Sequence, residues 1–440
     1  MFLITFLVSV LYIGFSLFFG YWWATDLSTV FAVPTAWFIV VFIAVVPGFV
    51  YMFYLSSLAM GRVKKHEAPE VLPPVSVIVP AYNAEGQIGE TLESILSQEY
   101  PGEIRILVAN DGSTDKTAEE VKRLQKDHPN IEMLSLPQRG KSHALNAALR
   151  HVETTYFITV DSDTILHRQA ILHIVSAIVR KEYAAVAGAL LPKNHDSSFV
   201  TRMQVWDYSL GIYATKLVQS FYRSTMVAQG AFSIYKTAVI LELGGFADSI
   251  GEDIVLTWGL LKAGYKTSFE RRALAFTDVP ENFKTLIKQR KRWARGMIES
   301  FKRNKGIVKS KKIASATRCM LIVNMLFPLI DFAFSVFIPL GIVLALWGNF
   351  LIVGKLTLLL LPMTILLCVL IDRRLKSALK HIGCKECGVS ENQAMCAGGA
   401  CLPRRSILAF FGYILVYPFV LAPNCVIAYL QEILYEEKKW

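Results

Sequence analysis

The chain has 440 residues, of which 53% are hydrophobic and 18% are charged, and its mean hydropathy is +0.41. This composition is too apolar for an ordinary soluble globule and too charged for a protein made only of membrane spans. The formal net charge of +11 does not indicate a nucleic-acid partner, because the basic residues cluster near the ends of apolar segments. Anionic headgroups of a lipid bilayer are the expected partner there.

The first 61 residues are predicted to form two membrane-spanning helices. They contain no lysine or arginine and form two apolar runs, 2–24 and 31–60, each longer than the ~20 residues that cross a bilayer. A cleaved signal peptide would carry a basic residue ahead of its apolar stretch, and the first basic residue is Arg62. Because Arg62 and two lysines follow the second run, the positive-inside rule places the next segment and the N-terminus in the cytoplasm.

Apolar segments return after residue 312 and predict further spans. Residues 318–371 are long enough for two helices and residues 406–434 for one more, so we expect five spans in all. The loop between them, 372–405, has basic flanks that place it in the cytoplasm. The loop contains Cys384, Cys387, Cys396 and Cys401. Four cysteines could bind zinc, but their irregular spacing without a histidine leaves unligated thiols as the alternative.

Residues 73–280 carry the pattern of a cytosolic α/β domain, in which short β-branched runs alternate with helical stretches. The expected strands are 75–79, 104–108 and 156–160, and the expected helices are 90–98, 114–126 and 142–151. Such alternation predicts a parallel sheet with helices on both faces. Ligands of these sheets bind beyond the carboxyl ends of the strands, so polar residues at those ends are the first candidates for a site.

Polar residues follow the first two predicted strands. Tyr82 follows the first, and Asp111 follows the second within an Asn-Asp-Gly-Ser sequence that could equally cap the next helix. Lys141 ends a basic Gln-Arg-Gly-Lys loop before a helix, where it could hold a phosphate or be an ordinary surface residue. A P-loop is not expected, because the upstream glycine of that motif is missing.

Asp161 and Asp163 form the most specific metal signal in the chain. Residues i and i+2 of an extended segment point to the same side, so both carboxylates face one point just beyond a predicted strand. Two such acids repel unless a cation separates them, and Mg²⁺ is usually held by one or two carboxylates together with substrate phosphates. The alternative is a pair of acids in a solvated turn.

Two further acids, Glu252 and Asp253, stand at the start of a helix predicted to end at residue 263. Acids in the first helical turn stabilise the helix dipole. A carboxylate in this position could also act as a general base toward a hydroxyl group. The residues alone do not choose between the two.

An amphipathic region, 281–312, is predicted to lie at the membrane interface, with one helix over 281–304. Gln289, Arg292 and Trp293 are spaced i, i+3 and i+4, so they share one face of that helix. An amide, a guanidinium and a flat aromatic ring together suit a sugar and its leaving diphosphate. For the neighbouring residues Arg290 and Lys291 we expect no role other than contact with lipid headgroups.

In order along the chain, these motifs resemble those of the membrane-bound, processive family 2 glycosyltransferases. That family includes synthases of poly-N-acetylglucosamine, chitooligosaccharides, hyaluronan and cellulose. The resemblance covers about residues 73–301 and implies a GT-A (Rossmann-like) α/β fold. It also implies that this cytosolic domain is embedded between α-helical transmembrane segments of a bacterial inner or plasma membrane.

For the donor, the resemblance implies that Tyr82, Glu85 and Asp111 hold the uridine of a UDP-sugar, with Lys141 near the base or ribose. The two aspartates of the Asp-Ser-Asp motif would bind the diphosphate together with Mg²⁺ or Mn²⁺. Gln289 and Arg292 would hold the pyrophosphate in place.

For the acceptor, the resemblance implies that Asp253, the second acid of the Glu252–Asp253 pair, is the general base. Trp293 would stack under the acceptor sugar, and residues 228–232 resemble the acceptor-side loop of the family. Gly251 before the acid pair is closer to the chitooligosaccharide and hyaluronan type than the threonine usual in cellulose synthases, which favours an N-acetylhexosamine.

The expected activity is inverting, processive polymerisation of a UDP-activated sugar, with UDP-GlcNAc favoured, into a β-linked polysaccharide that is exported through the spans. The expected partners are the UDP-sugar donor, the growing glycan, the bilayer and an accessory membrane or export subunit. Two alternatives stay open. One is single transfer to a lipid-linked acceptor, and the other is a catalytically silent UDP-sugar-binding membrane protein.

Overall fold

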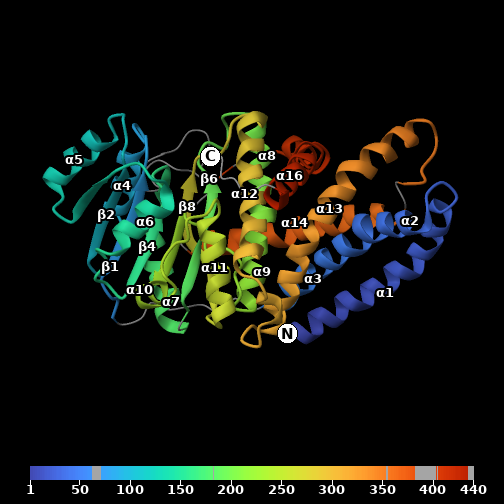
Figure 1. Cartoon of the computed structure of the whole chain (residues 1–440), viewed down its shortest axis with the longest axis horizontal. Coiled ribbons are helices and arrows are strands. Elements are labelled where there is room, and N and C mark those ends of the chain that lie inside the picture. The colour runs from blue at the N-terminus through green and yellow to red at the C-terminus, as the bar shows by residue number, and fades with distance from the viewer. Residues whose placement is uncertain (62–70, 182, 353–354, 382–402, 404, 435–440) are drawn as a thin grey trace.

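A computed structural model gives the fold and describes residues 1–61, 71–181, 183–352, 355–381, 403 and 405–434. An α/β domain lies at one end of the molecule and long helices lie at the other (Figure 1). The four cysteines for which zinc was considered lie outside the described residues. The zinc prediction therefore stays a prediction.

Eight strands form one sheet in the order β3-β2-β1-β4-β7-β6-β8-β5. The first four in this order pair in parallel, as the alternating pattern predicted. They are β1 (Val75–Ala81), β2 (Ile104–Asp111), β3 (Ile131–Leu136) and β4 (Tyr156–Val160). Every residue of β1 is buried, which explains why this half is visible in the sequence as continuous apolar runs.

The other half of the sheet is mixed, which corrects the expectation of a purely parallel sheet. Its strands are β5 (Thr164–Leu166), β6 (Ala185–Pro192), β7 (Phe232–Lys236) and β8 (Thr267–Thr277). β7 runs antiparallel to both β4 and β6, and β5 runs antiparallel to β8. The register between β6 and β8 shifts at Gly188, and β8 carries Glu-Arg-Arg in its centre, so no simple apolar pattern marks β8.

Helices pack on both faces of the sheet, and alternate residues of β1 belong to different cores. Val75, Val77 and Val79 pack in one cluster with α4 (Ile88–Leu96) and α7 (Ala170–Lys181). Ile78 packs on the opposite face. That face is covered by α6 (Lys141–Leu149), α10 (Thr237–Glu242) and α11 (Glu252–Ala263). This follows from the two-residue period of a strand.

The helix after β2 begins later than expected. α5 spans Thr117–Asp127, whereas the sequence predicted a start at residue 114. Oδ1 of Asp115 accepts the backbone N–H of Thr117 at 3.1 Å, so Asp115 satisfies the free N–H of the first turn. Ser113 is instead bound to the loop after β1, where its Oγ accepts the N–H of Asn83 at 3.1 Å.

Four helical segments in the described part of the chain are long and apolar enough to cross a membrane: Phe2–Leu27, Val33–Met60, Ser315–Leu346 and Ile407–Leu434. The first is α1, and the second joins α2 (Val33–Val40) to α3 (Val46–Met60) through a π-helical turn. The third is α13, and the fourth contains α15 (Ile407–Leu415) and α16 (Tyr417–Leu434). The fifth predicted span falls within α14 (Lys355–His381) and stays a prediction.

Two long helices connect the α/β domain to this bundle (Figure 1). One is continuous from α8 (Phe199–Asp207) through a π-helical segment, Tyr208–Ala214, to α9 (Thr215–Phe221). The other is α12 (Phe283–Arg303), which begins with the Asn282 side chain accepting the N–H of Thr285 at 3.0 Å. α12 packs against both α11 and α16, so it joins the sheet domain to the last apolar segment.

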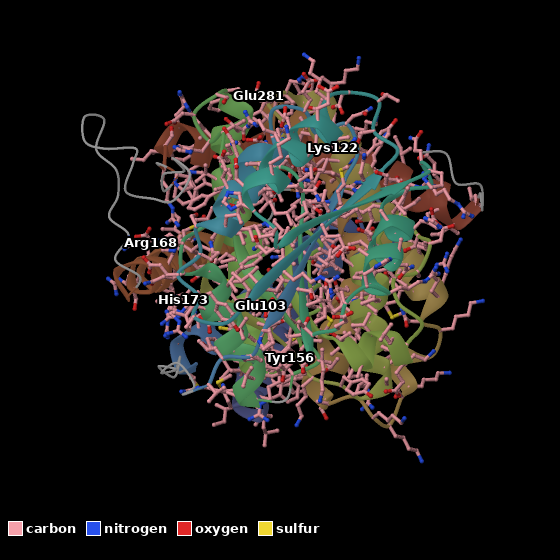
Figure 2. The ribbon with its side chains drawn as sticks, turned by 90° about the vertical axis from the view of Figure 1, so that its left-hand side faces the viewer. Glu103, Lys122, Tyr156, Arg168, His173 and Glu281 are labelled. Carbon is pink, nitrogen blue, oxygen red and sulfur yellow. The ribbon has the colours of Figure 1, made fainter. Side chains whose placement is uncertain are left out.

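All the strands except β5 and β7 run in one direction, and their carboxyl ends define the functional edge of the sheet. Figure 2 shows Tyr156, where β4 begins, near one end of the domain and Glu281, which follows β8, at the opposite end. The carboxyl ends of β1, β2, β4 and β8 therefore lie toward Glu281, where α12 starts.

Candidate active site

Two adjoining cavities lie at the carboxyl edge of the sheet. The first, of about 560 Å³, is lined by Tyr82, Asp111 and the loop that ends at Lys141. The second, of about 390 Å³, lies between the sheet domain, the α8–α9 helix and α12. Lys141, Asp161 and Asp163 line both, so the two volumes meet at the Asp-Ser-Asp motif.

Asp111 organises the floor of the first cavity. Its carboxylate is buried and accepts the backbone N–H groups of Arg139 at 2.9 Å and Gly140 at 2.8 Å. Gly140 has φ of +99°, a conformation that favours glycine, so the loop can turn sharply into α6. Asp111 thus fixes the basic loop, while the half-exposed Tyr82 lies at the rim.

Glu85 was expected among the donor-binding residues, but the structure places it elsewhere. One oxygen lies 3.7 Å from Nζ of Lys116, and the other accepts the Lys116 backbone N–H at 3.3 Å. The Glu85 N–H donates to Asp115 at 3.0 Å. Glu85 is absent from both linings within the described chain, so it links the loop after β1 to the start of α5.

Lys141 connects the Asp-Ser-Asp motif to the acid pair of α11. Its amine forms an ion pair with Asp161 and lies 3.6 Å from Oε1 of Glu252. Burial lowers the pKa of Lys141, but the negative charges of Asp161 and Glu252 outweigh it and raise the pKa above its ordinary value. The lysine is therefore a fixed positive charge between the two acidic motifs.

Asp163, the second aspartate of the motif, accepts hydrogen bonds from two threonine side chains. Thr164 and Thr277 donate hydroxyl hydrogen bonds to its Oδ1 at 3.2 and 3.3 Å. Burial, and then the charge of Asp161, raise the pKa of Asp163 to about 6, although Lys141 opposes the shift. Two carboxylates so close in a partly desolvated place fit a divalent cation.

The number of acidic side chains at the site also bears on which metal ligands the substrate would have to supply. The described part of the chain has no group of three or more His, Cys, Asp or Glu side chains arranged to hold a metal ion. Asp161 and Asp163 therefore suit a hard cation that takes its other ligands from a diphosphate and water.

Asp253 lies in the second cavity at the start of α11. Its Oδ2 accepts the N–H of Gly230 at 3.3 Å, which brings the predicted acceptor-side loop beside the acid. A Cβ at Gly230 would lie 3.0 Å from the amine of Lys141, so a side chain there would disturb the lysine. The neighbouring Glu252 is buried, and burial raises its pKa while Lys141 opposes the rise.

A close backbone contact sets α12 against the start of α11. The Cα of Gly251 lies 3.1 Å from where a Cβ on Gly296 would stand. Glu299, one turn further along α12, accepts the Ile250 N–H at 2.9 Å. This crossing brings Gln289, Arg292 and Trp293 to the cavity that holds Asp253.

Arg290 was expected to face lipid headgroups, and the structure corrects this. Its side chain is buried, 2.6 Å from Oδ2 of Asp207, and donates to the hydroxyl of Tyr417 at 3.1 Å. Its guanidinium also lies 4.0 Å from the ring centroid of Trp293. A helical pattern predicts which face of the helix a residue occupies, but not which side chains pair with its charge. Asp207 and Tyr417, the partners of Arg290, are both far from it in the sequence.

The sequence analysis also missed the wall formed by the α8–α9 helix. Its π-helical segment contributes Tyr208 and Gly211 to the second cavity, and α9 contributes Lys216 and Gln219. The available signal was a lysine within an otherwise apolar stretch. π-Helical turns often occur at functional sites, but a sequence pattern does not reveal them.

One wall of the second cavity comes from a candidate membrane span. Asn324 of α13 lines the cavity, although it is far in sequence from the sheet domain. The volume around Asp253 and Trp293 therefore extends from the strand ends to the helices that are able to cross a membrane.

Comparisons with known proteins agree with this geometry. Residues 76–244 match the family model described as glycosyl transferase family 2. The chain is 31% identical over 275 residues to a poly-beta-1,6-N-acetyl-D-glucosamine synthase of Staphylococcus epidermidis, covering 61% of this chain and 65% of that protein. It is 31% identical over 241 residues to an N-acetylglucosaminyltransferase of Azorhizobium caulinodans, covering 52% of this chain and 61% of that protein. The matches thus span somewhat less than two thirds of these relatives.

A solved structure resembles the fold. The mannosyltransferase PcManGT from Pyrobaculum calidifontis, in complex with GDP-Man and Mn²⁺, superposes with a TM-score of 0.56 and 22% sequence identity. The similarity covers 75% of this chain and 94% of that one. The chain thus has a GT-A-like fold, and its residues 76–244 are similar to glycosyl transferase family 2.

Proposed function

We propose that the chain is an inverting, processive glycosyltransferase that polymerises UDP-GlcNAc into a β-linked polysaccharide and passes the product across a membrane. The named activities of the Staphylococcus and Azorhizobium relatives support N-acetylglucosamine as the transferred sugar. The observation that carries processivity is the second cavity, which is lined by Asp253, by Trp293 and by Asn324 of α13. A product leaving the base would meet the spans directly.

The first cavity would hold the donor. The ring of Tyr82 lies at its rim, and the loop fixed by Asp111 forms its floor, so the uridine has an aromatic and a polar wall. Asp161 and Asp163 would hold Mg²⁺ or Mn²⁺ against the diphosphate. The metal would neutralise the charge that develops on the leaving group. Mn²⁺ and GDP-Man in the mannosyltransferase of similar fold are compatible with this assignment.

The second cavity would hold the acceptor. Asp253 would take the proton of the acceptor hydroxyl while the oxygen attacks the anomeric carbon from the face opposite UDP. The bond from that carbon to the diphosphate oxygen breaks, and its electron pair leaves with UDP. Arg292 and Gln289, on the same wall, would contact the departing diphosphate. A single displacement converts an α-linked donor into a β-linked product without a covalent enzyme intermediate.

Trp293 would support the growing chain. It is 39% exposed and lines the cavity, so its flat ring is available for stacking against a sugar. The catalytic domain would face the cytoplasm of a multi-pass protein of the bacterial inner or plasma membrane. An accessory membrane or export subunit is the further partner we propose.

Donor turnover by detergent-purified protein tests this proposal. We expect Mg²⁺- or Mn²⁺-dependent UDP release with UDP-GlcNAc, compared with UDP-Glc, UDP-GlcA and UDP-Gal, and a polymeric product by size analysis. Chelation of the metal and Asp163→Asn should each lower turnover at least ~10²-fold. Asp127→Asn, at the exposed end of α5, is the matched control.

The product decides among the alternatives. If the protein adds a single sugar to a lipid-linked acceptor, it is a single-transfer enzyme and not a processive synthase. Binding of UDP without release of UDP from any of the four donors would show a catalytically silent protein.

A further inference from the structure

Lys216 is a buried lysine in the second cavity that the proposed chemistry does not use. It lies in the first turn of α9, is only 7% exposed, and is followed by the buried Leu217 and Val218. Within the described part of the chain, its amine has no ion-pair or hydrogen-bond partner. An ammonium group has three donors and no acceptor, so the partners of this amine must come from what the cavity holds. Such a group is costly to bury unless a ligand supplies oxygen atoms.

The charges around Lys216 show which half of the site it serves. Asp253 is the charged group that acts on it, and it raises the lysine pKa against a larger lowering by burial, with a result of about 7. Asp161 and Asp163 line both cavities, whereas Lys216 lines the second alone. The other charged side chains of the second cavity are Glu252 of α11, Arg292 of α12, Lys141 of α6 and Asp278 beyond β8.

The packing of α9 keeps the lysine in place. The adjacent Thr215 forms a side-chain hydrogen bond with Tyr54 of α3. One turn further on, Oε1 of Gln219 accepts the N–H of Met226 at 2.9 Å. α9 is thereby fixed to the spans on one side and to the loop before β7 on the other.

We propose that Lys216 is a positioning residue of the acceptor half of the cavity, where its ammonium group binds oxygen atoms of the acceptor saccharide and turns the attacking hydroxyl toward Asp253. The acceptor chemistry is a neutral, oxygen-rich sugar chain, whose hydroxyl, ring and amide oxygens accept hydrogen bonds. This inference rests on the proposed function. A donor-diphosphate role is less well supported, because Lys141 and Arg292 already supply cations near the aspartate pair.

Steady-state kinetics with soluble N-acetylglucosamine oligomers test the role. Lys216→Met removes the amine and keeps an unbranched chain. The variant should raise the acceptor KM about 10- to 100-fold, as for loss of a hydrogen bond to a charged group. The KM for UDP-GlcNAc and the slow hydrolysis of UDP-GlcNAc without acceptor should stay within about twofold of wild type. Lys122→Met, on the outer face of α5 (Figure 2), is the matched control.

A pH series separates positioning from a merely structural role. The ammonium form of Lys216 binds the acceptor, and its pKa is about 7. The wild-type acceptor KM should therefore rise as pH increases through 7. Lys216→Arg should restore acceptor affinity and remove that pH dependence, because a guanidinium stays protonated. The pH series on wild type and Lys216→Arg remains informative if Lys216→Met does not fold.

Three outcomes would overturn the inference. One is an unchanged acceptor KM in Lys216→Met, and another is a parallel rise in the KM for UDP-GlcNAc, which would assign the lysine to the diphosphate. The third is a pH dependence of the acceptor KM that persists in Lys216→Arg. A wild-type protein that turns over no UDP-sugar would instead contradict the proposed function.

Discussion

Arg290 of α12 and Asp207 of α8 form a buried ion pair in which the Arg290 guanidinium lies 2.6 Å from Oδ2 of the aspartate. Tyr417 of α16 donates to the same carboxylate oxygen at 3.0 Å. The guanidinium carbon of Arg290 also lies 4.0 Å from the centroid of the Trp293 ring. One charged cluster therefore joins three helices and holds the aromatic ring proposed to support the glycan.

Removal of this arginine should affect both stability and product length. Arg290→Met leaves Asp207 buried without its cation, which costs about 3–5 kcal/mol in the free energy of unfolding. It also removes the cation that holds Trp293, so the polymer should become shorter. Thermal unfolding in detergent and size analysis of the product measure the two effects.

A double variant separates the two contributions of Arg290. Arg290→Met with Asp207→Asn removes the unpaired charge, so most of the stability should return while the polymer stays short. Lys291→Met, the neighbour on the same helix, is the control. Recovery of full-length polymer in the double variant would show that Arg290 does not act through Trp293.

Loss of the proposed base should separate binding from chemistry. Asp253→Asn keeps the size of the side chain and an oxygen able to accept the Gly230 N–H, but cannot take a proton. UDP affinity should change by no more than about twofold, and transfer should fall at least ~10²-fold. Equilibrium binding measures the UDP affinity, and incorporation of sugar into product measures the transfer. Turnover near the wild-type rate would exclude Asp253 as the base.

The aromatic ring at the end of the cavity should control product length. Trp293→Ala should retain UDP-GlcNAc hydrolysis but shorten the polymer or abolish it, and Trp293→Phe should lie between the two because a smaller ring still stacks. Gel filtration of radiolabelled product gives the length. Trp347→Ala, at the exposed end of α13, is the control. Wild-type polymer from Trp293→Ala would refute the stacking role.

The crossing of α11 and α12 should be sensitive to one methyl group. In Gly296→Ala the new Cβ would stand 3.1 Å from the Cα of Gly251, and a backbone atom cannot easily move aside. The two helices would separate, at a cost of about 1–3 kcal/mol, and transfer should fall with them. Gly259→Ala is the matched control, since its Cβ would be 3.8 Å from Oδ1 of Asn304. Equal behaviour of the two variants would contradict this account.

His173, marked on α7 in Figure 2, should make stability depend on pH. Burial, and then the charge of Arg272, lower its pKa from 6.5 to about 4. Between these values the unfolded chain binds a proton that the folded chain does not, so stability falls as pH decreases from 6.5 to 4. His173→Gln should lose less stability than wild type between pH 7.5 and 5 in thermal unfolding. His128→Gln at the end of α5 is the control, and identical pH profiles for His173→Gln and wild type would count against the prediction.

The parallel half of the sheet and the order of the motifs along the chain were predictable, because both depend on residues that are close together in the sequence. Buried strands produce apolar runs, and the residues after them share an edge. The spacing of Gln289, Arg292 and Trp293 likewise places them on one helical face. The mixed half of the sheet was not predictable, because β8 is interrupted by charged residues, of which Glu270 and Arg272 form an ion pair within the strand.

The sequence by itself determined that apolar segments surround an α/β domain. It also determined an order of acids and an aromatic motif that resembles the family 2 glycosyltransferases. Only the tertiary structure decided the surroundings of those residues. It placed Glu85 at the start of α5, buried Arg290 against Asp207, and added Lys216 and Asn324 to the lining of the second cavity. The physical reason is that periodicity and chain order fix a residue's element and face, whereas charge pairing and cavity walls depend on contacts between segments far apart in the chain.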